Sequence, residues 1–137
     1  MFKIGILLVS MVLSYTAAAG EAKFSSQYLA CMDKSEGVTV SMLDCIADET
    51  KLQDDRLNKA YKSALKSIDP ARVKALQDAQ RAWVKFRDSN CRFYANPDGG
   101  TAATISANDC VMSSTAERAQ EIESLLPVQP LQGRNEQ

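Results

Sequence analysis

Two long helical segments joined by a tight turn constrain this chain more than any other feature. Between Ser41, a plausible N-cap, and Ile68, apolar residues recur at helical intervals without a proline or glycine. Asp69-Pro70 then ends this helix and begins the next, because aspartate can cap a helix and proline suits its first position. The second helix is expected to run to about Phe93. Two long helices joined in this way must lie roughly antiparallel.

Shorter elements are expected on either side of this hairpin. A short helix is predicted over 24–32, and the Ser-Thr-Ala-Glu capping box at 114–117 predicts a further helix that ends before Pro127. The run Asn-Pro-Asp-Gly-Gly-Thr at 96–101 has the turn chemistry of a loop, whereas 102–112 fits no clear pattern. The chain is therefore predicted to be all-α: a long antiparallel helical hairpin with shorter N- and C-terminal helices, stapled by disulfides.

The N-terminus has the pattern of a secretory signal peptide. Lys3 precedes an apolar run over 4–13, and the small residues Ala17 and Ala19 precede Gly20. The apolar run is too short to span a bilayer, although a short anchored helix is the alternative. We expect residues 1–19 to be removed near Ala19, leaving a periplasmic or secreted protein. Residues 20–126 then form one domain, and 127–137 are expected to be a disordered tail.

The chain contains four cysteines, Cys31, Cys45, Cys91 and Cys110. In an exported protein an even number indicates disulfides, and the alternative of a zinc site finds no histidine and no Cys-x-x-Cys pair. Three pairings are possible. Helix phase turns Cys45 away from the stripe expected to face the second helix, which favours Cys31 with Cys45 and Cys91 with Cys110. No metal or cofactor is expected.

The charge balance restricts the class of partner. The formal net charge is −1 at pH 7, and removal of Lys3 with the leader makes it −2. A nucleic acid or an anionic membrane surface would require a basic face, so neither is expected as a partner. A slightly acidic surface is compatible with a cationic protein. The sequence leaves the oligomeric state open.

Polar side chains fall on the helix faces that are expected to pack. Gln80 and Arg87 share a stripe with Trp83 on the second helix. Buried polar groups need partners, so we expect a structural polar core that crosses the helices. The expected members are Asp54, Asn58, Gln80, Arg87 and Arg118. The alternative, Asp54 as a general acid or base, lacks the second titrating group that catalysis needs, because the chain has no histidine.

The segment between Cys91 and Cys110 is the candidate partner-binding loop. Loops held by a disulfide are common binding elements, because the crosslink reduces the ordering cost on binding. The candidate residues are Arg92, Tyr94, Asn96, Asp98 and Thr101. A connector without a partner is the alternative. Trp83 and Phe86 are expected in the core rather than in a binding patch, and no serine has a neighbouring base that would indicate an enzyme.

In combination these motifs resemble the LprI-type lysozyme inhibitor domain, a small exported bacterial helical family. The resemblance covers 28–126 and rests on Cys31, Cys45, Asp54-x-x-Leu57-Asn58-x-x-Tyr61, Ala79-Gln80-x-x-Trp83-x-x-Phe86-Arg87-Asp88-x-x-Cys91, Gly99-Gly100-Thr101, Cys110 and Thr115-x-x-Arg118. It implies a disulfide-bonded helical domain that binds lysozyme and protects the cell wall, and it identifies no inhibitory residue. The alternative is a periplasmic interaction or envelope-stress module with another protein partner.

Overall fold

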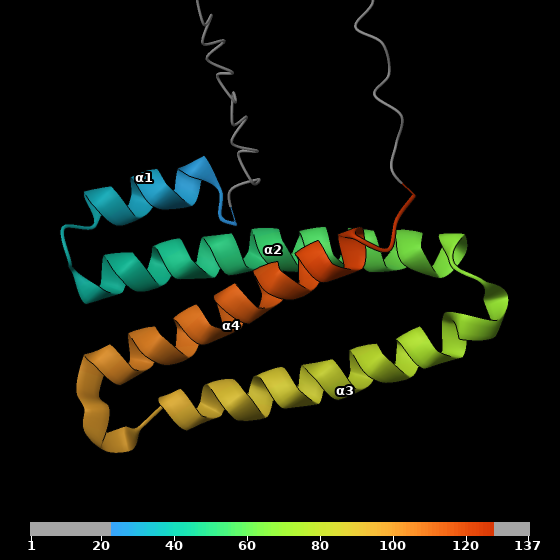
Figure 1. Ribbon diagram of the computed structural model, residues 1–137. Helices are drawn as coiled ribbons and strands as arrows, with labels where there is room; N and C mark the ends of the chain where they lie inside the picture. The colour runs from blue at the N-terminus through green and yellow to red at the C-terminus, as the bar shows by residue number, and fades with distance from the viewer. Residues whose placement is uncertain (1–22, 128–137) are drawn as a thin grey trace, which may run out of the picture.

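The computed structural model describes residues 23–127, and this part of the chain is all-α, as predicted. Its elements are α1 (Ser26–Lys34), α2 (Thr39–Ser67), α3 (Pro70–Tyr94), the short 3-10 helix η1 (Pro97–Gly99) and α4 (Gly100–Glu123) (Figure 1). The predicted leader over 1–19 lies outside the described residues, as does the predicted tail over 127–137 apart from its first residue.

The turn between α2 and α3 has the expected chemistry. The Asp69 carboxylate accepts a hydrogen bond from the Ala71 backbone N–H at 2.9 Å, and Pro70 takes the first helical position. At its other end α2 begins at Thr39, two residues before Ser41, and the residue at its N-cap position, Val38, makes no side-chain cap hydrogen bond. The predicted N-cap at Ser41 is therefore wrong.

Helix α4 is the largest departure from the prediction. It is continuous from Gly100 to Glu123, so the expected loop over 96–101 shrinks to a short turn and the capping box at 114–117 lies inside a helix. The Thr115 hydroxyl donates to the carbonyl of Val111 at 2.7 Å instead of capping a helix start. The first half of α4 consists mainly of small and polar residues, and for that reason it shows no amphipathic stripe in the sequence.

The three long helices run in alternating directions, and α4 lies between α2 and α3 (Figure 1). Helices α2 and α3 are antiparallel, as predicted, but the buried face of α2 packs on α4, and α3 packs on α4 from the other side. Helix α1 folds back along α2. The alternation brings the α1–α2 connection and the α3–α4 connection to the same end of the bundle.

The core lies mainly between α2 and α4. Its central cluster consists of Leu57, Ala60, Ala64, Ala119 and Ile122. The alanines let the two helices approach closely. Helix α3 contributes only partly buried side chains to this cluster, Leu76 and Trp83, and Cys91 is its one buried residue. No helix within 23–127 combines the length and apolar character needed to cross a bilayer.

Candidate functional site

Two disulfides brace the end of the bundle where the connections meet. Cys31–Cys45 joins α1 to α2, and Cys91–Cys110 joins α3 to α4, with Cα separations of 5.7 and 5.4 Å. These are the two pairs that helix phase favours. Each crosslink closes beside a change of chain direction, so it fixes the relative position of the two helices that leave the turn.

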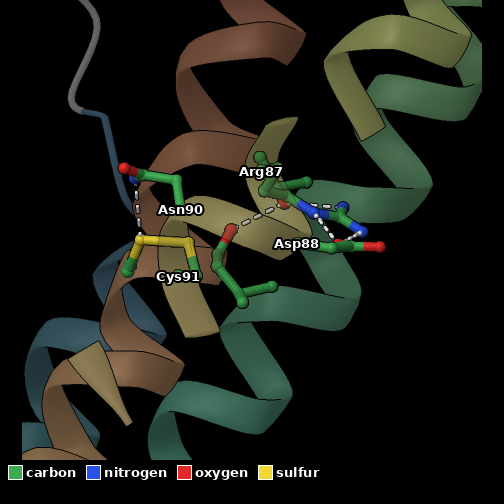
Figure 2. Close-up of a disulfide and its surroundings, with 7 residues drawn as sticks. Arg87, Asp88, Asn90 and Cys91 are labelled. Carbon is green, nitrogen blue, oxygen red and sulfur yellow. Dashed lines mark hydrogen bonds and ion pairs between the residues drawn. A yellow bond between two sulfur atoms is a disulfide. The ribbon is translucent and has the colours of Figure 1, made fainter. Parts of the chain in front are cut away.

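Figure 2 shows the surroundings of the Cys91–Cys110 disulfide. Asn90 points its amide toward Cys110, with Nδ2 at 3.6 Å from Sγ. One turn earlier, Arg87 Nε and Nη2 donate to the carboxylate of Asp88 at 3.0 and 2.8 Å. Arg87 Nη1 also reaches the buried Thr115 hydroxyl of α4, at 3.4 Å. Arg87 thereby attaches α3 to α4 next to the crosslink.

A polar joint between α3 and α4 continues from Arg87. Arg118, only 7% exposed, donates from Nε to Gln80 Oε1 at 2.9 Å. Its Nη1 pairs with the exposed Glu121 at 2.7 Å. The Trp83 ring lies near two guanidinium groups, 5.1 Å from that of Arg87 and 5.8 Å from that of Arg118. The joint therefore combines hydrogen bonds with cation–π contacts.

Asp54 and Asn58 do not take part in this joint, contrary to expectation. Both are exposed, and Asn58 Nδ2 donates to Asp54 Oδ2 of the same helix at 3.0 Å. The buried stripe of α2 is shifted by one residue from the face that Asp54 and Asn58 were expected to share. Its members are Cys45, Ile46, Glu49, Gln53, Leu57, Ala60 and Ala64. Asp54 and Asn58 each follow a buried residue directly, and this rotation turns them away from α4.

The buried carboxylate of Glu49 holds the start of α1 on α2. Glu49 is not among the residues predicted from the sequence. Glu49, 3% exposed, accepts hydrogen bonds from the backbone N–H and the hydroxyl of Ser25, at 2.9 and 2.5 Å, and from Gln53 Nε2 at 2.7 Å. Ser25 also caps α1 by accepting from the Tyr28 N–H. The helical spacing of Glu49 and Gln53 from Ile46 is the signal that could have identified them.

A second missed contact joins α2 to α4. Arg56 Nε donates to Glu123 Oε1 at 2.7 Å, and its Nη2 pairs with the other carboxylate oxygen. These two side chains are far apart in sequence, and no local pattern predicts that they meet. Such bidentate geometry is the strongest form of arginine–carboxylate contact.

Tyr28 lies near two carboxylates behind the Cys31–Cys45 crosslink. Burial raises the pKa of the Tyr28 hydroxyl, and the charges of Asp109 and Glu49 raise it further.

No other chemistry is indicated at this corner of the described structure. The Ser25 hydroxyl donates to Glu49 and accepts from the Tyr28 backbone N–H, so its role is structural. Among residues 23–127, no three cysteine or acidic side chains are placed to hold a metal ion.

The candidate partner-binding residues are all exposed at the α3–α4 turn. They do not form a long loop, which corrects the prediction. Arg92 and Tyr94 lie in the last turn of α3, Asn96 caps η1 by accepting from the Asp98 N–H at 3.0 Å, and Thr101 is the second residue of α4. The segment is thus a compact turn between two crosslinked helices, with little freedom to lose on binding.

The most exposed aromatic residue at this turn, Phe93, is not among the candidate residues predicted from the sequence. Phe93 is 81% exposed and contacts Tyr94, itself 46% exposed, edge to face with ring centroids 5.6 Å apart. Phe86, expected in the core, is also exposed, at 65%, because α3 touches the bundle along one narrow side. Two shallow hollows, of about 530 and 250 Å³, flank Arg92. This arrangement suits binding to another macromolecule.

Comparison with known proteins shows which family this chain belongs to. The family model described as "Lysozyme inhibitor LprI" matches residues 31–122, more than half of the chain. A protein of Rhizobium meliloti (strain 1021), described as uncharacterized, is 29% identical over 104 residues, which cover 64% of this chain and 75% of that protein. No solved structure matches the chain.

Proposed function

Because the chain belongs to the lysozyme inhibitor LprI family, we propose that it binds lysozyme and thereby protects the bacterial cell wall from hydrolysis. Family membership is the observation that carries this proposal. The match includes both disulfides, all of α2 and α3, and nearly all of α4. The protein acts by occupying the enzyme, not by chemistry of its own.

The residues proposed to contact the enzyme lie at the α3–α4 turn. They are Arg92, Tyr94, Asn96, Asp98 and Thr101. Their exposure supports this role, as does the crosslink directly behind them, because a surface that is already ordered loses little entropy on binding. Asp98 and the acidic balance of the chain favour association with a cationic enzyme.

The protein is proposed to work outside the cytoplasm. In this proposal residues 1–19 are a signal peptide, cleavage near Ala19 releases the chain from Gly20, and the mature protein is periplasmic or secreted. The two disulfides support export, because such crosslinks persist in oxidising compartments. A lysozyme inhibitor must also meet its target there.

The proposal is tested by titrating lysozymes of the c, g and i types with the oxidised protein that begins at Gly20, using the clearing of a cell-wall suspension as the readout. We expect saturable inhibition of at least one type at near-stoichiometric amounts. Protein that has been reduced and alkylated at its four cysteines is the matched control, and it should inhibit less. If folded protein inhibits none of the three types, the proposal is rejected in favour of an envelope interaction module.

A further inference from the structure

The α3–α4 tip, defined as Arg92, Phe93, Tyr94 and the turn 95–99, carries an exposed aromatic pair that the fold does not need. The Phe93 and Tyr94 rings contact each other edge to face, and they lie beyond Cys91, where α3 no longer covers the core. Large apolar groups left this exposed are a common mark of an interaction site. Aromatic residues and arginine are also the side chains that most often dominate the binding energy of interfaces.

Arg92 gives the α3–α4 tip a positive charge between two hollows. Within residues 23–127, Arg87 pairs with Asp88 and Arg118 with Glu121, whereas no ion pair involves Arg92. Arg92 lines both the hollow beside the aromatic pair and the hollow beside the disulfide. An exposed guanidinium of this kind presents a planar fork of donors that suits a carboxylate.

We infer that the α3–α4 tip enters the substrate cleft of lysozyme, with Arg92 facing the catalytic carboxyl groups and with Phe93 and Tyr94 covered by the cleft walls. This inference rests on the proposed function. Glycoside hydrolases carry two carboxyl groups on either side of the bond that they cleave, so the cleft is both concave and acidic. The α3–α4 tip presents two exposed aromatic side chains and the Arg92 guanidinium, and the Cys91–Cys110 crosslink holds its shape. The exposed Asp98 in η1 balances the charge of Arg92, so the tip is close to neutral.

The other braced corner of the bundle fits this cleft less well. The α1–α2 connection exposes the aliphatic side chains of Val38 and Val40, and its exposed charged neighbours are Lys34 and the carboxylates of Asp33, Glu36 and Asp44. This corner therefore has two surplus negative charges, whereas the charges of Arg92 and Asp98 cancel at the α3–α4 tip. The surplus charges have the same sign as the catalytic carboxyl groups and would repel them. The α3–α4 tip is therefore the corner that brings aromatic side chains and a guanidinium to the cleft without surplus negative charge.

The test compares inhibition constants for single variants of the oxidised protein against the lysozyme type that the wild-type protein inhibits. We expect Phe93→Ala and Tyr94→Ala each to weaken inhibition about tenfold or more. Arg92→Glu should weaken it further than Arg92→Ala, because it brings like charges together. The matched controls are Phe86→Ala, an exposed aromatic elsewhere on α3, and Lys85→Ala, an exposed cation on the same helix, and both should stay within about twofold of wild type.

A competition experiment tests entry into the cleft itself. A trisaccharide of N-acetylglucosamine, which occupies the cleft, should raise the apparent inhibition constant in proportion to its concentration. Inhibition that the trisaccharide leaves unchanged would overturn the inference, as would full potency in all the variants at the tip, while the proposed function would still stand. Loss of potency in Val40→Ser alone would place the contact at the α1–α2 corner instead. If the wild-type protein inhibits no lysozyme, the proposed function and this inference fail together.

Discussion

Replacing Arg118 with methionine tests the polar joint between α3 and α4. The change keeps an unbranched stem of similar length, so packing is largely preserved. It removes the 2.9 Å hydrogen bond from a charged donor to Gln80, which contributes about 1.5–3 kcal/mol. It also removes the contact with the Trp83 ring at 5.8 Å, near the limit for a cation–π interaction and contributing about 0.5 kcal/mol.

Two further effects determine how far Arg118→Met lowers the free energy of unfolding. The pair with Glu121 contributes little, because that carboxylate is 64% exposed and screened by water. Arg118 itself is nearly buried, and removing its charge recovers part of the desolvation cost of folding. We therefore expect the free energy of unfolding to fall by about 2 kcal/mol, which corresponds to a decrease in Tm of roughly 8 °C for a domain of this size.

Urea denaturation followed by helical circular dichroism measures this change. Glu121→Gln is the control on the exposed side of Arg118, and it should alter the free energy of unfolding by less than about 0.5 kcal/mol. Gln80→Met completes a double-mutant cycle with Arg118→Met, and we expect a coupling energy of about 1 kcal/mol. A loss below about 0.5 kcal/mol for Arg118→Met, or strict additivity in the cycle, would refute the reasoning.

Three other predictions follow from the same structure. The raised pKa of Tyr28 means that its contribution to stability is complete below pH of about 10 and is lost as the pH rises through the folded-state pKa. Tyr28→Phe should therefore remove a tyrosine that ionises above pH of about 10 in a 295 nm titration of the folded protein. Replacing Cys91 and Cys110 together with serine opens a crosslink spanning 19 positions and should cost about 3 kcal/mol in urea denaturation. Glu49→Ala removes three hydrogen bonds, and amide exchange in α1 should accelerate at least tenfold more than amide exchange in α3; equal acceleration in both helices would show that Glu49 does not hold α1 on α2.

Local chemistry made much of this fold predictable. Asp69-Pro70 determines the α2–α3 turn by local effects alone, because the aspartate side chain caps α3 and the proline ring suits the first helical position. The period of apolar residues likewise identifies α2 and α3 as helices, since neither contains an interior glycine or proline. Helix phase favoured the observed disulfide pairs because it turned Cys45 away from the stripe expected to face α3; in the structure Cys45 is itself buried, next to the face of α2 that packs on α4.

The expectations that the structure corrects concern features that depend on packing between helices. The first half of α4 is too polar and too small to show a stripe, and it is held as a helix by the crosslink at Cys110 and by its position beside α2. Only the second half of α4 is predictable from the sequence, so the long contact between α2 and α4 is not. The expected buried face of α2 is therefore one residue out of phase and includes Asp54 and Asn58. Phe93 is expected from the sequence to lie at the end of the second helix, and only the packing of residues 23–127 shows that it is 81% exposed.

The central claim is that this protein inhibits a lysozyme by binding it. A titration at an enzyme concentration well above the dissociation constant tests it most directly, with residual hydrolysis of cell-wall glycan recorded at each ratio of the oxidised protein to enzyme. We predict that activity falls linearly and reaches its minimum near one equivalent. Activity that stays at its starting level through a large excess of folded protein, for every lysozyme type tried, would contradict the claim.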